Sequence, residues 1–293
     1  MSLDSLRFLE IPDLRTPALV TAFAGWSDAG AAASTSAQYL IDRWHAAPLA
    51  EIEAEEFYDF TQQRPMVRYV EGDYRRIEWP ENVFHYHRTP ERDLIVFAGI
   101  EPHLHWKAYV NLLLEIVRRF KVELVVNLGA FFVDFPHTRP LRVSGTAPDP
   151  EMLARAGVFT TGGRYEGPTG LNGVFSTTLR EQGIPLAALW ANVPHYVSAM
   201  PNPAACLALL RALTAMLSVD VPLGRMIRSA TAFQNQLNEA TSKNDEVSDY
   251  VRTLEERVDS EASGQAAPTE LPATDKIVQE IEEFFRRPRD EST

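Results

Sequence analysis

The sequence predicts a three-layer α/β/α fold, with a mostly parallel sheet between two layers of helices. Short apolar runs alternate along the chain with longer segments of helical composition. A short apolar run bounded by turn residues is typical of a strand that is buried on both faces. Strands that alternate with helices indicate a parallel sheet covered on both sides.

The stretch ALVTAFAGWSDAG, residues 18–30, contains the first of these strands and the turn that follows it. Ser27 or Asp28 then precedes an alanine-rich helix expected over residues 29–44. A short oxygen side chain caps a helix by accepting hydrogen bonds from its unpaired N–H groups. The turn therefore lies at the carboxyl end of a parallel strand, where open α/β sheets bind their ligands. We expect the functional surface at this rim.

Three further buried strands are expected, and each ends near a glycine or a proline. They span residues 94–100, 122–128 and 185–192. Because the carboxyl ends of parallel strands share one edge, the residues after Gly25, Gly99, Gly129 and Asn192 should lie close together. A strand is also predicted over residues 50–57. A hairpin of residues 75–79 with residues 83–87 is predicted around Pro80-Glu81-Asn82.

Helices are predicted between the strands from apolar spacing and from proline positions. Apolar residues at a spacing of three and four give the segment 105–120 one apolar face. Pro203 favours a helix start, because the first turn tolerates a missing N–H. The predicted helices span residues 105–120, 150–156, 171–182 and 203–217. The long polar loop over 133–150 suggests a function, since loops of that length are uncommon in compact domains.

The C-terminal part has a different pattern, which divides the chain into an α/β core over residues 1–220 and a helical extension. From Ala230 to Val258, apolar residues recur at alternating spacings of three and four, with Asn244 at an a-type position. This heptad predicts one long helix within residues 221–258. Residues 259–293 are expected to form a linker and a short amphipathic helix.

Two packings of this long helix remain open. It could lie on its own core or a neighbouring helix, or it could form a coiled coil with a second subunit. In the second case the contact seam would be Phe233, Leu237, Asn244, Val247, Val251 and Leu254.

Composition and charge exclude several classes of partner. The net charge is −12, and residues 234–293 hold 15 acidic against 7 basic side chains. Nucleic acid and anionic lipid both require clustered Lys and Arg, so we expect neither as a partner. No apolar run approaches the length of a membrane span, and no export signal is visible. The single cysteine, Cys206, suits a reducing cytoplasm.

Charged and polar side chains follow the predicted strand ends and are candidates for chemistry. A carboxylate pair with a histidine could carry out acid–base catalysis, but an Asp–Arg set such as Asp59 with Arg64 or Arg139 could equally be a structural ion pair. No Gly-x-Ser-x-Gly elbow is present, so a hydrolase serine is unsupported. The candidates at the strand ends are Asp28, Glu101, His137, Arg139 and His195.

Two weaker patterns concern anions and metals. Gly167, Gly170 and Gly173 precede a predicted helix, whose N–H groups could cradle an anion, although ordinary turn geometry also explains them. His85 and His87 lie two apart on a predicted strand and could share a face, but no third ligand is evident. We therefore predict no metal site and no cofactor.

Short motifs spaced along the chain carry a resemblance to a known family. They are GWSDAG at 25–30, GIEP at 99–102 with Trp106, NLG at 127–129, GPTG at 167–170 and PHY at 194–196. Together they resemble the PAC2 family, which comprises proteasome-assembly-chaperone-like proteins. The FYDF…RP, PHTRP and YEGPTG stretches are similar to its actinobacterial branch. The resemblance covers about residues 15 to 255.

The resemblance implies an α/β/α architecture similar to that of phosphorylases and hydrolases, with no catalytic activity established for the family as a whole. Eukaryotic and archaeal relatives are associated with binding proteasome α-subunits or with building oligomers. Some archaeal relatives resemble proteasome binders through a hydrophobic-Tyr-X ending, which the final Glu-Ser-Thr of this sequence lacks.

We therefore expect a protein-interaction or assembly factor that self-associates, possesses chaperone-like properties and has itself or a proteasome-related protein as partner. The alternative is a small-molecule hydrolase, phosphorylase or ligase that uses a cleft at the strand ends. No catalytic residue is nominated. The candidate cleft or binding residues are Trp26, Ser27, Asp28, Asp59, Arg64, Glu101, Trp106, His137, Arg139, Gly167, Gly170, His195 and Tyr196.

Overall fold

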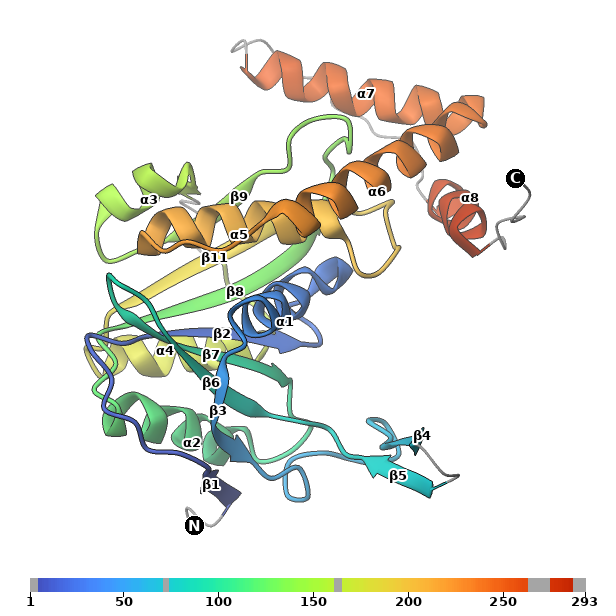
Figure 1. Cartoon of the computed structure of the whole chain (residues 1–293). Coiled ribbons are helices and arrows are strands. Elements are labelled where there is room, and N and C mark those ends of the chain that lie inside the picture. Colours follow the sequence, from blue (N-terminus) through green and yellow to red (C-terminus); the bar gives the residue numbers. More distant parts are fainter. Residues whose placement is uncertain (1–4, 71–73, 161–164, 263–274, 287–293) are drawn as a thin grey trace.

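A computed structural model describes residues 5–70, 74–160, 165–262 and 275–286 (Figure 1). Within these residues, nine strands form one sheet in the order β1-β3-β6-β7-β2-β8-β11-β9-β10, and β4 pairs with β5 apart from it. The strands are β1 (Leu6–Phe8), β2 (Ala18–Ala24), β3 (Ala47–Ile52), β4 (Met66–Val70), β5 (Tyr74–Glu78), β6 (Val83–Arg88), β7 (Asp93–Ile100), β8 (Leu124–Val133), β9 (Val143–Thr146), β10 (Phe159–Thr160) and β11 (Leu186–Pro194).

Helices cover both faces of the nine-stranded sheet. Core residues of α1 and α5 pack on one face, and those of α2 and α4 pack on the other. The helices are α1 (Ala32–Trp44), α2 (Trp106–Arg119), α3 (Pro150–Ala156), α4 (Leu171–Glu181), α5 (Pro203–Leu217), α6 (Gly224–Ser242), α7 (Asp245–Ala262) and α8 (Asp275–Arg286). This arrangement confirms the predicted three-layer α/β/α fold with its C-terminal helices. No helix in the described part of the chain is both long and apolar enough to cross a membrane.

The centre of the sheet is parallel and its edges are mixed. Strand β2 pairs in parallel with β7 and β8, and β8 pairs in parallel with β11. Strands β1, β3 and β6 add to one side in antiparallel fashion, and β9 adds antiparallel to β11. Residues Ala18, Leu19 and Val20 of β2 are fully buried, because helices cover both of its faces. The buried apolar runs of the sequence are thus the parallel strands.

The ends of these parallel strands meet at one edge, as predicted. The backbone nitrogen of Glu101, just after β7, donates to the carbonyl of Ala24 at the end of β2, at 2.9 Å. The nitrogen of Ala130 in β8 donates to the carbonyl of Ser27, also at 2.9 Å. Because β11 lies directly beside β8, its end joins the same edge.

The predicted hairpin of residues 75–79 with 83–87 is wrong. Strand β5 instead pairs with β4, and β6 enters the main sheet between β3 and β7. The reason is Asn82, a residue type that favours turns but is here only 1% exposed. Its Oδ1 accepts hydrogen bonds from the hydroxyls of Tyr58 and Tyr109 and from the nitrogen of Ile100. These bonds hold the chain against β7 and direct it into the sheet.

The single long helix predicted from Ala230 to Val258 is also wrong. The helix is interrupted between Ser242, the last residue of α6, and Asp245, the first residue of α7 (Figure 1). Asn244 lies at the break and is half-buried, rather than being a polar residue inside a seam. Its Oδ1 accepts from the nitrogens of Glu246 and Val247, at 2.8 and 3.3 Å. Asn favours such a capping position over a helix interior, so it starts a new helix here.

The apolar stripe itself is buried within one chain. Phe233 and Leu237 of α6 pack with Val247, Val251 and Leu254 of α7. Residues of α8 and the segment after β11 complete this cluster, which lies apart from the two main cores. Of the two packings considered for this stripe, a single chain adopts the one in which it lies against other elements of the same chain.

Candidate functional site

Glu101 joins the ends of β2 and β7 to the start of α4. Its carboxylate accepts from the nitrogen of Trp26 at 3.2 Å and from the nitrogen of Leu171 at 2.5 Å. Leu171 is the first residue of α4, whose unpaired N–H groups and dipole favour a negative charge. The first N–H of this helix, one of the groups that could cradle an anion, is therefore bound by a carboxylate of the chain itself.

Two glycines make this junction possible. A Cβ on Gly170 would lie 2.7 Å from Oε1 of Glu101 and 2.9 Å from Oγ of Ser27. A Cβ on Gly25 would lie 2.9 Å from Cβ of Glu101, and the φ of Gly25 is +139°. One glycine of each motif, Gly25 of GWSDAG and Gly170 of GPTG, is therefore explained by close packing around Glu101. Gly167 lies on the exposed turn before α4, outside this junction.

Asp28 is a buried cap for α1. Its carboxylate accepts from the nitrogen of Ala33 at 2.7 Å, from the nitrogen of Ser34 at 3.3 Å and from the Ser34 hydroxyl. Burial raises the pKa of Asp28, and these hydrogen bonds oppose that rise. The capping role expected for Ser27 or Asp28 thus belongs to Asp28.

Trp26 is 63% exposed at the rim, beside the carboxylate of Glu101. Trp106 begins α2, and its indole N–H donates to the carbonyl of Pro102 at 2.6 Å. These two tryptophans therefore differ in role: one offers surface, and the other holds the turn of the GIEP motif.

Asp59 closes a local turn, with no ion pair to Arg64 or Arg139 among the described residues. Its carboxylate accepts from Gln62 and from Thr61, which lowers the pKa of Asp59 to about 2. Arg64 is exposed. The structural ion pair considered as one alternative for Asp59 is not formed among the described residues, because its carboxylate binds Thr61 and Gln62.

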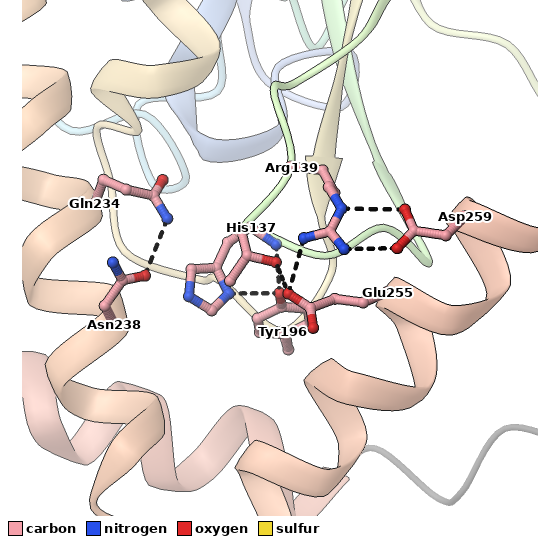
Figure 2. A network of polar contacts seen from close by, with 8 residues as sticks. His137, Arg139, Tyr196, Gln234, Asn238, Glu255 and Asp259 are labelled. Carbon is pink, nitrogen blue, oxygen red and sulfur yellow. Dashed lines mark hydrogen bonds and ion pairs between the residues drawn. The ribbon is translucent and has the colours of Figure 1, made fainter. Parts of the chain in front are cut away.

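The PHTRP and PHY motifs meet in a second cluster, separate from the Glu101 junction (Figure 2). The hydroxyl of Tyr196 lies 2.7 Å from the backbone nitrogen of His137 and 2.7 Å from its Nδ1. The backbone N–H donates to the hydroxyl oxygen. The buried hydroxyl proton then needs an acceptor, and among the described contacts Nδ1 is the one that can accept it. The ring is then neutral, with its own proton on Nε2. Burial lowers the pKa of His137 to about 4 and raises the pKa of Tyr196.

His195 lies beside this pair and contacts α7. Its Nδ1 is 3.1 Å from a carboxylate oxygen of Asp134 and 3.3 Å from the carbonyl of Val133. Because both are acceptors, Nδ1 carries the proton. In the neutral ring, Nε2 then accepts from the hydroxyl of Tyr250, at 3.2 Å. Tyr250 and Tyr196 meet edge to face, so one aromatic cluster connects the core to α7.

Arg139 fixes the next turn of α7 (Figure 2). Its guanidinium binds both carboxylate oxygens of Asp259, at 3.2 and 2.7 Å, and one oxygen of Glu255 at 3.1 Å. Thr138 donates to the same oxygen of Glu255. His137, Arg139, His195 and Tyr196 therefore form a platform on which α7 docks.

Sequence reasoning missed the α7 side of this platform. Tyr250 is 1% exposed but falls outside the a and d positions of the heptad, and the sequence pattern presents Glu255 and Asp259 only as part of an acidic tail. The one available signal was chemical complementarity between two segments. The loop after β8 carries Arg139 and a histidine, and α7 carries the carboxylates and the tyrosine that can bind such groups.

No three His, Cys, Asp or Glu side chains gather in a metal-binding arrangement in the residues that the structure describes. The ring of His87 stacks on Trp44, with centroids 5.2 Å apart. Burial lowers the pKa of both His85 and His87. Cys206 is fully buried, and burial raises the pKa of its thiol to about 12.

The chain is an α/β/α protein. The residues of its short sequence motifs connect strand ends and loops to the helices packed beside them. A profile of the PAC2 family matches residues 22–241, and the chain belongs to the PAC2 family. No curated protein matched the chain.

Solved structures agree with this assignment. A PAC2 family protein from Streptomyces avermitilis is 41% identical, with a TM-score of 0.72 over 80% of this chain and 99% of that one. A proteasome-assembly chaperone homologue from Mycobacterium tuberculosis is 40% identical, with a TM-score of 0.71 and the same coverage. A protein of unknown function from Corynebacterium glutamicum is 28% identical, with a TM-score of 0.80 over 89% of this chain and 99% of that one.

Proposed function

We propose that this protein is a chaperone-like assembly factor that self-associates through the β4–β5 ribbon, called here the arm (Met66–Val70 and Tyr74–Glu78). The arm extends away from the nine-stranded sheet (Figure 1). Every residue of both strands is exposed. A two-stranded ribbon alone is marginally stable in water, so an arm of this kind gains stability when a partner covers it.

The apolar side chains of the arm support a role in binding protein. Met66, Val67, Tyr69, Tyr74 and Ile77 are between 53% and 75% exposed. Apolar side chains gathered on an exposed surface mark interaction sites in soluble proteins. Within the described part of the chain, β4 and β5 pair only with each other, so their outer edges present backbone groups that can add a strand from a partner.

Charge supports a second copy of this chain as the occupant. The arm strands carry Arg68, Arg75 and Arg76 against Glu78, and Glu71 and Asp73 between them in the sequence bring residues 66–78 to no net charge. Residues 234–293 carry 15 acidic and 7 basic side chains. Arg68 pairs with Glu78, whereas Arg75 and Arg76 form no ion pair with the residues that the structure describes. Arg75 and Arg76, rather than the arm as a whole, can pair with carboxylates of the acidic C-terminal helices of a second molecule, and complementary charge favours both encounter and register.

The M. tuberculosis relative, described as a proteasome-assembly chaperone homologue, supports the wider role. We therefore propose proteasome-related proteins as the further partners. The cytoplasm is the proposed location, since a lone buried cysteine requires no oxidising compartment.

The test is the mass in solution of the double variant Tyr74→Ser/Ile77→Ser, measured by light scattering after size-exclusion chromatography over a range of concentrations. The wild type should be larger than one chain, and the variant should shift toward the monomer. The matched control is Ile11→Ser, because Ile11 and Ile77 have similar exposed fractions, 58% and 54%. A monomeric wild type, or an arm variant with unchanged mass, would contradict the proposal.

A further inference from the structure

A cavity of about 940 Å³ lies between α5, α6 and the segment that leads from β8 into β9. Its volume is within the range of roughly 300–1,000 Å³ that is typical of small-molecule sites. Leu207, Ala208 and Ala212 of α5, with Ala230 of α6, supply an apolar wall. The cavity is separate from the arm and does not depend on the proposed self-association.

The charged groups around this cavity are mainly cations. Arg139, Arg142 and Arg211 line it, against one carboxylate, that of Asp259. Arg139 already binds Asp259 and Glu255. Arg142 and Arg211 form no ion pair with any residue that the structure describes. Arg142 comes from the segment before β9 and Arg211 from α5, so two arginines without an ion pair in the described part of the chain line the same cavity from different elements.

Arg142 is held in place by aromatic rings. Its guanidinium carbon lies 5.1 Å from the ring centre of Phe135 and 5.7 Å from that of Phe159. An arginine that lies over aromatic rings can still present N–H donors to an anion. Because the two rings restrict its motion, Arg142 loses less entropy when it binds an oxyanion.

His137 adds a buried donor. The ring is 4% exposed, and its Nε2 has no hydrogen-bond partner. The Tyr196 hydroxyl occupies Nδ1, so the proton on Nε2 is free to donate. Figure 2 shows this side of the ring facing Asn238 of α6, whose Oδ1 accepts from Gln234 at 3.2 Å but does not meet the geometry of a hydrogen bond with the ring. An unpaired buried donor is costly, and an acceptor group of a ligand would satisfy it.

We propose that this cavity binds an organic anion: a carboxylate or a phosphate monoester on an apolar body. Arg142 and Arg211 bind the anionic group, the α5 wall contacts the apolar body, and His137 Nε2 donates to an acceptor on the ligand. Binding involves no covalent step.

The experiment uses isothermal titration calorimetry of the full chain with octanoate and with octyl phosphate. Octylamine and octanol have the same apolar body without the negative charge. At least one anion should bind with saturation, and the difference between the two identifies which anionic group is preferred. Arg142→Met and Arg211→Met should each weaken that binding about tenfold or more, because each removes a charge-assisted hydrogen bond.

The matched control is Arg180→Met, an exposed arginine of α4 on the opposite face of the sheet, which should bind as the wild type does. Arg211 is exposed, so its variant should fold even if the Arg142 variant does not. The proposal is overturned if neither anion binds, if octylamine or octanol binds as tightly as the anions, or if Arg211→Met leaves the affinity unchanged.

Discussion

The hydroxyl of Tyr196 bonds both the backbone nitrogen and the ring Nδ1 of His137, at 2.7 Å each. One side chain of the PHY motif thereby fixes both the position and the proton of a side chain in the PHTRP motif. The two residues are 59 positions apart in the sequence. The two side chains form a buried structural contact. Burial there lowers the pKa of His137, so the native protein resists protonation of this ring.

The first prediction concerns acid stability. Burial lowers the pKa of His137 from an ordinary 6.5 to about 4. Between these values the unfolded chain binds a proton that the native chain does not, so the free energy of unfolding falls as the pH falls. Each pH unit in this range removes about 1.36 kcal/mol, so the loss reaches about 3 kcal/mol near pH 4. Urea unfolding at a series of pH values measures it.

The variant for this test is His137→Asn, which cannot titrate in this range. Its free energy of unfolding should depend less steeply on pH than that of the wild type between pH 6.5 and 4. For each protein, the free energy of unfolding at neutral pH should be subtracted from the value at each lower pH. A loss of packing that does not depend on pH then cancels from the comparison. A variant with the same slope as the wild type would show that other groups cause the acid sensitivity.

The second prediction compares how much two contacts near α7 contribute to the free energy of unfolding: the buried hydroxyl of Tyr196 and the surface ion pairs of Arg139. Tyr196→Phe leaves two buried groups of His137 unpaired and should cost about 1–3 kcal/mol of unfolding free energy. Arg139→Met breaks contacts with Glu255 and Asp259, which are partly open to solvent, and should cost less than about 1 kcal/mol. Equilibrium urea unfolding decides, and a larger loss for the arginine variant would reverse this order.

The third prediction concerns the Glu101 junction. Gly170→Ala would place a Cβ 2.7 Å from the Glu101 carboxylate, so the α4 start must shift, at a cost of about 1–3 kcal/mol. The control is Gly224→Ala at the start of α6, where the nearest atom to a new Cβ is 3.6 Å away. It should leave the melting temperature unchanged or raise it slightly. Similar losses in both variants would mean that the packing around Glu101 is not responsible.

The sequence was sufficient for the four parallel strands at the centre of the sheet and for the helices that cover them, because burial on both faces leaves a plain signal. Runs such as LIVFAGI predicted β7 without knowledge of its neighbours. Asn82 shows where this fails. Its type indicates a turn, yet three donors from distant segments make it a buried acceptor. Long-range hydrogen bonds of this kind leave no pattern in the local sequence.

The candidate site was predicted only in part for a related reason. The position of Asp28 and Glu101 at the strand ends follows from topology, but their partners do not. Glu101 is bound by the N–H of Leu171, 70 residues away, so a carboxylate that suggested acid–base chemistry instead caps a helix. The same holds for Arg139, whose partners are on α7, 116 and 120 residues away.

The last prediction concerns Asn244, for which the heptad and the structure give opposite outcomes. In a continuous seam, a buried Asn costs stability and an apolar substitution would increase it. In the structure, Asn244 accepts from two N–H groups at the start of α7, so Asn244→Ala should lower the free energy of unfolding by about 0.5–2 kcal/mol. Asn244→Asp should retain the cap, since its carboxylate accepts the same bonds. Loss of the cap should loosen the first turn of α7, which docks on the platform of His137, Arg139, His195 and Tyr196. Hydrogen exchange in residues 245–250 should therefore become faster relative to α5. A stabilised Asn244→Leu variant with unchanged exchange would instead favour the continuous helix.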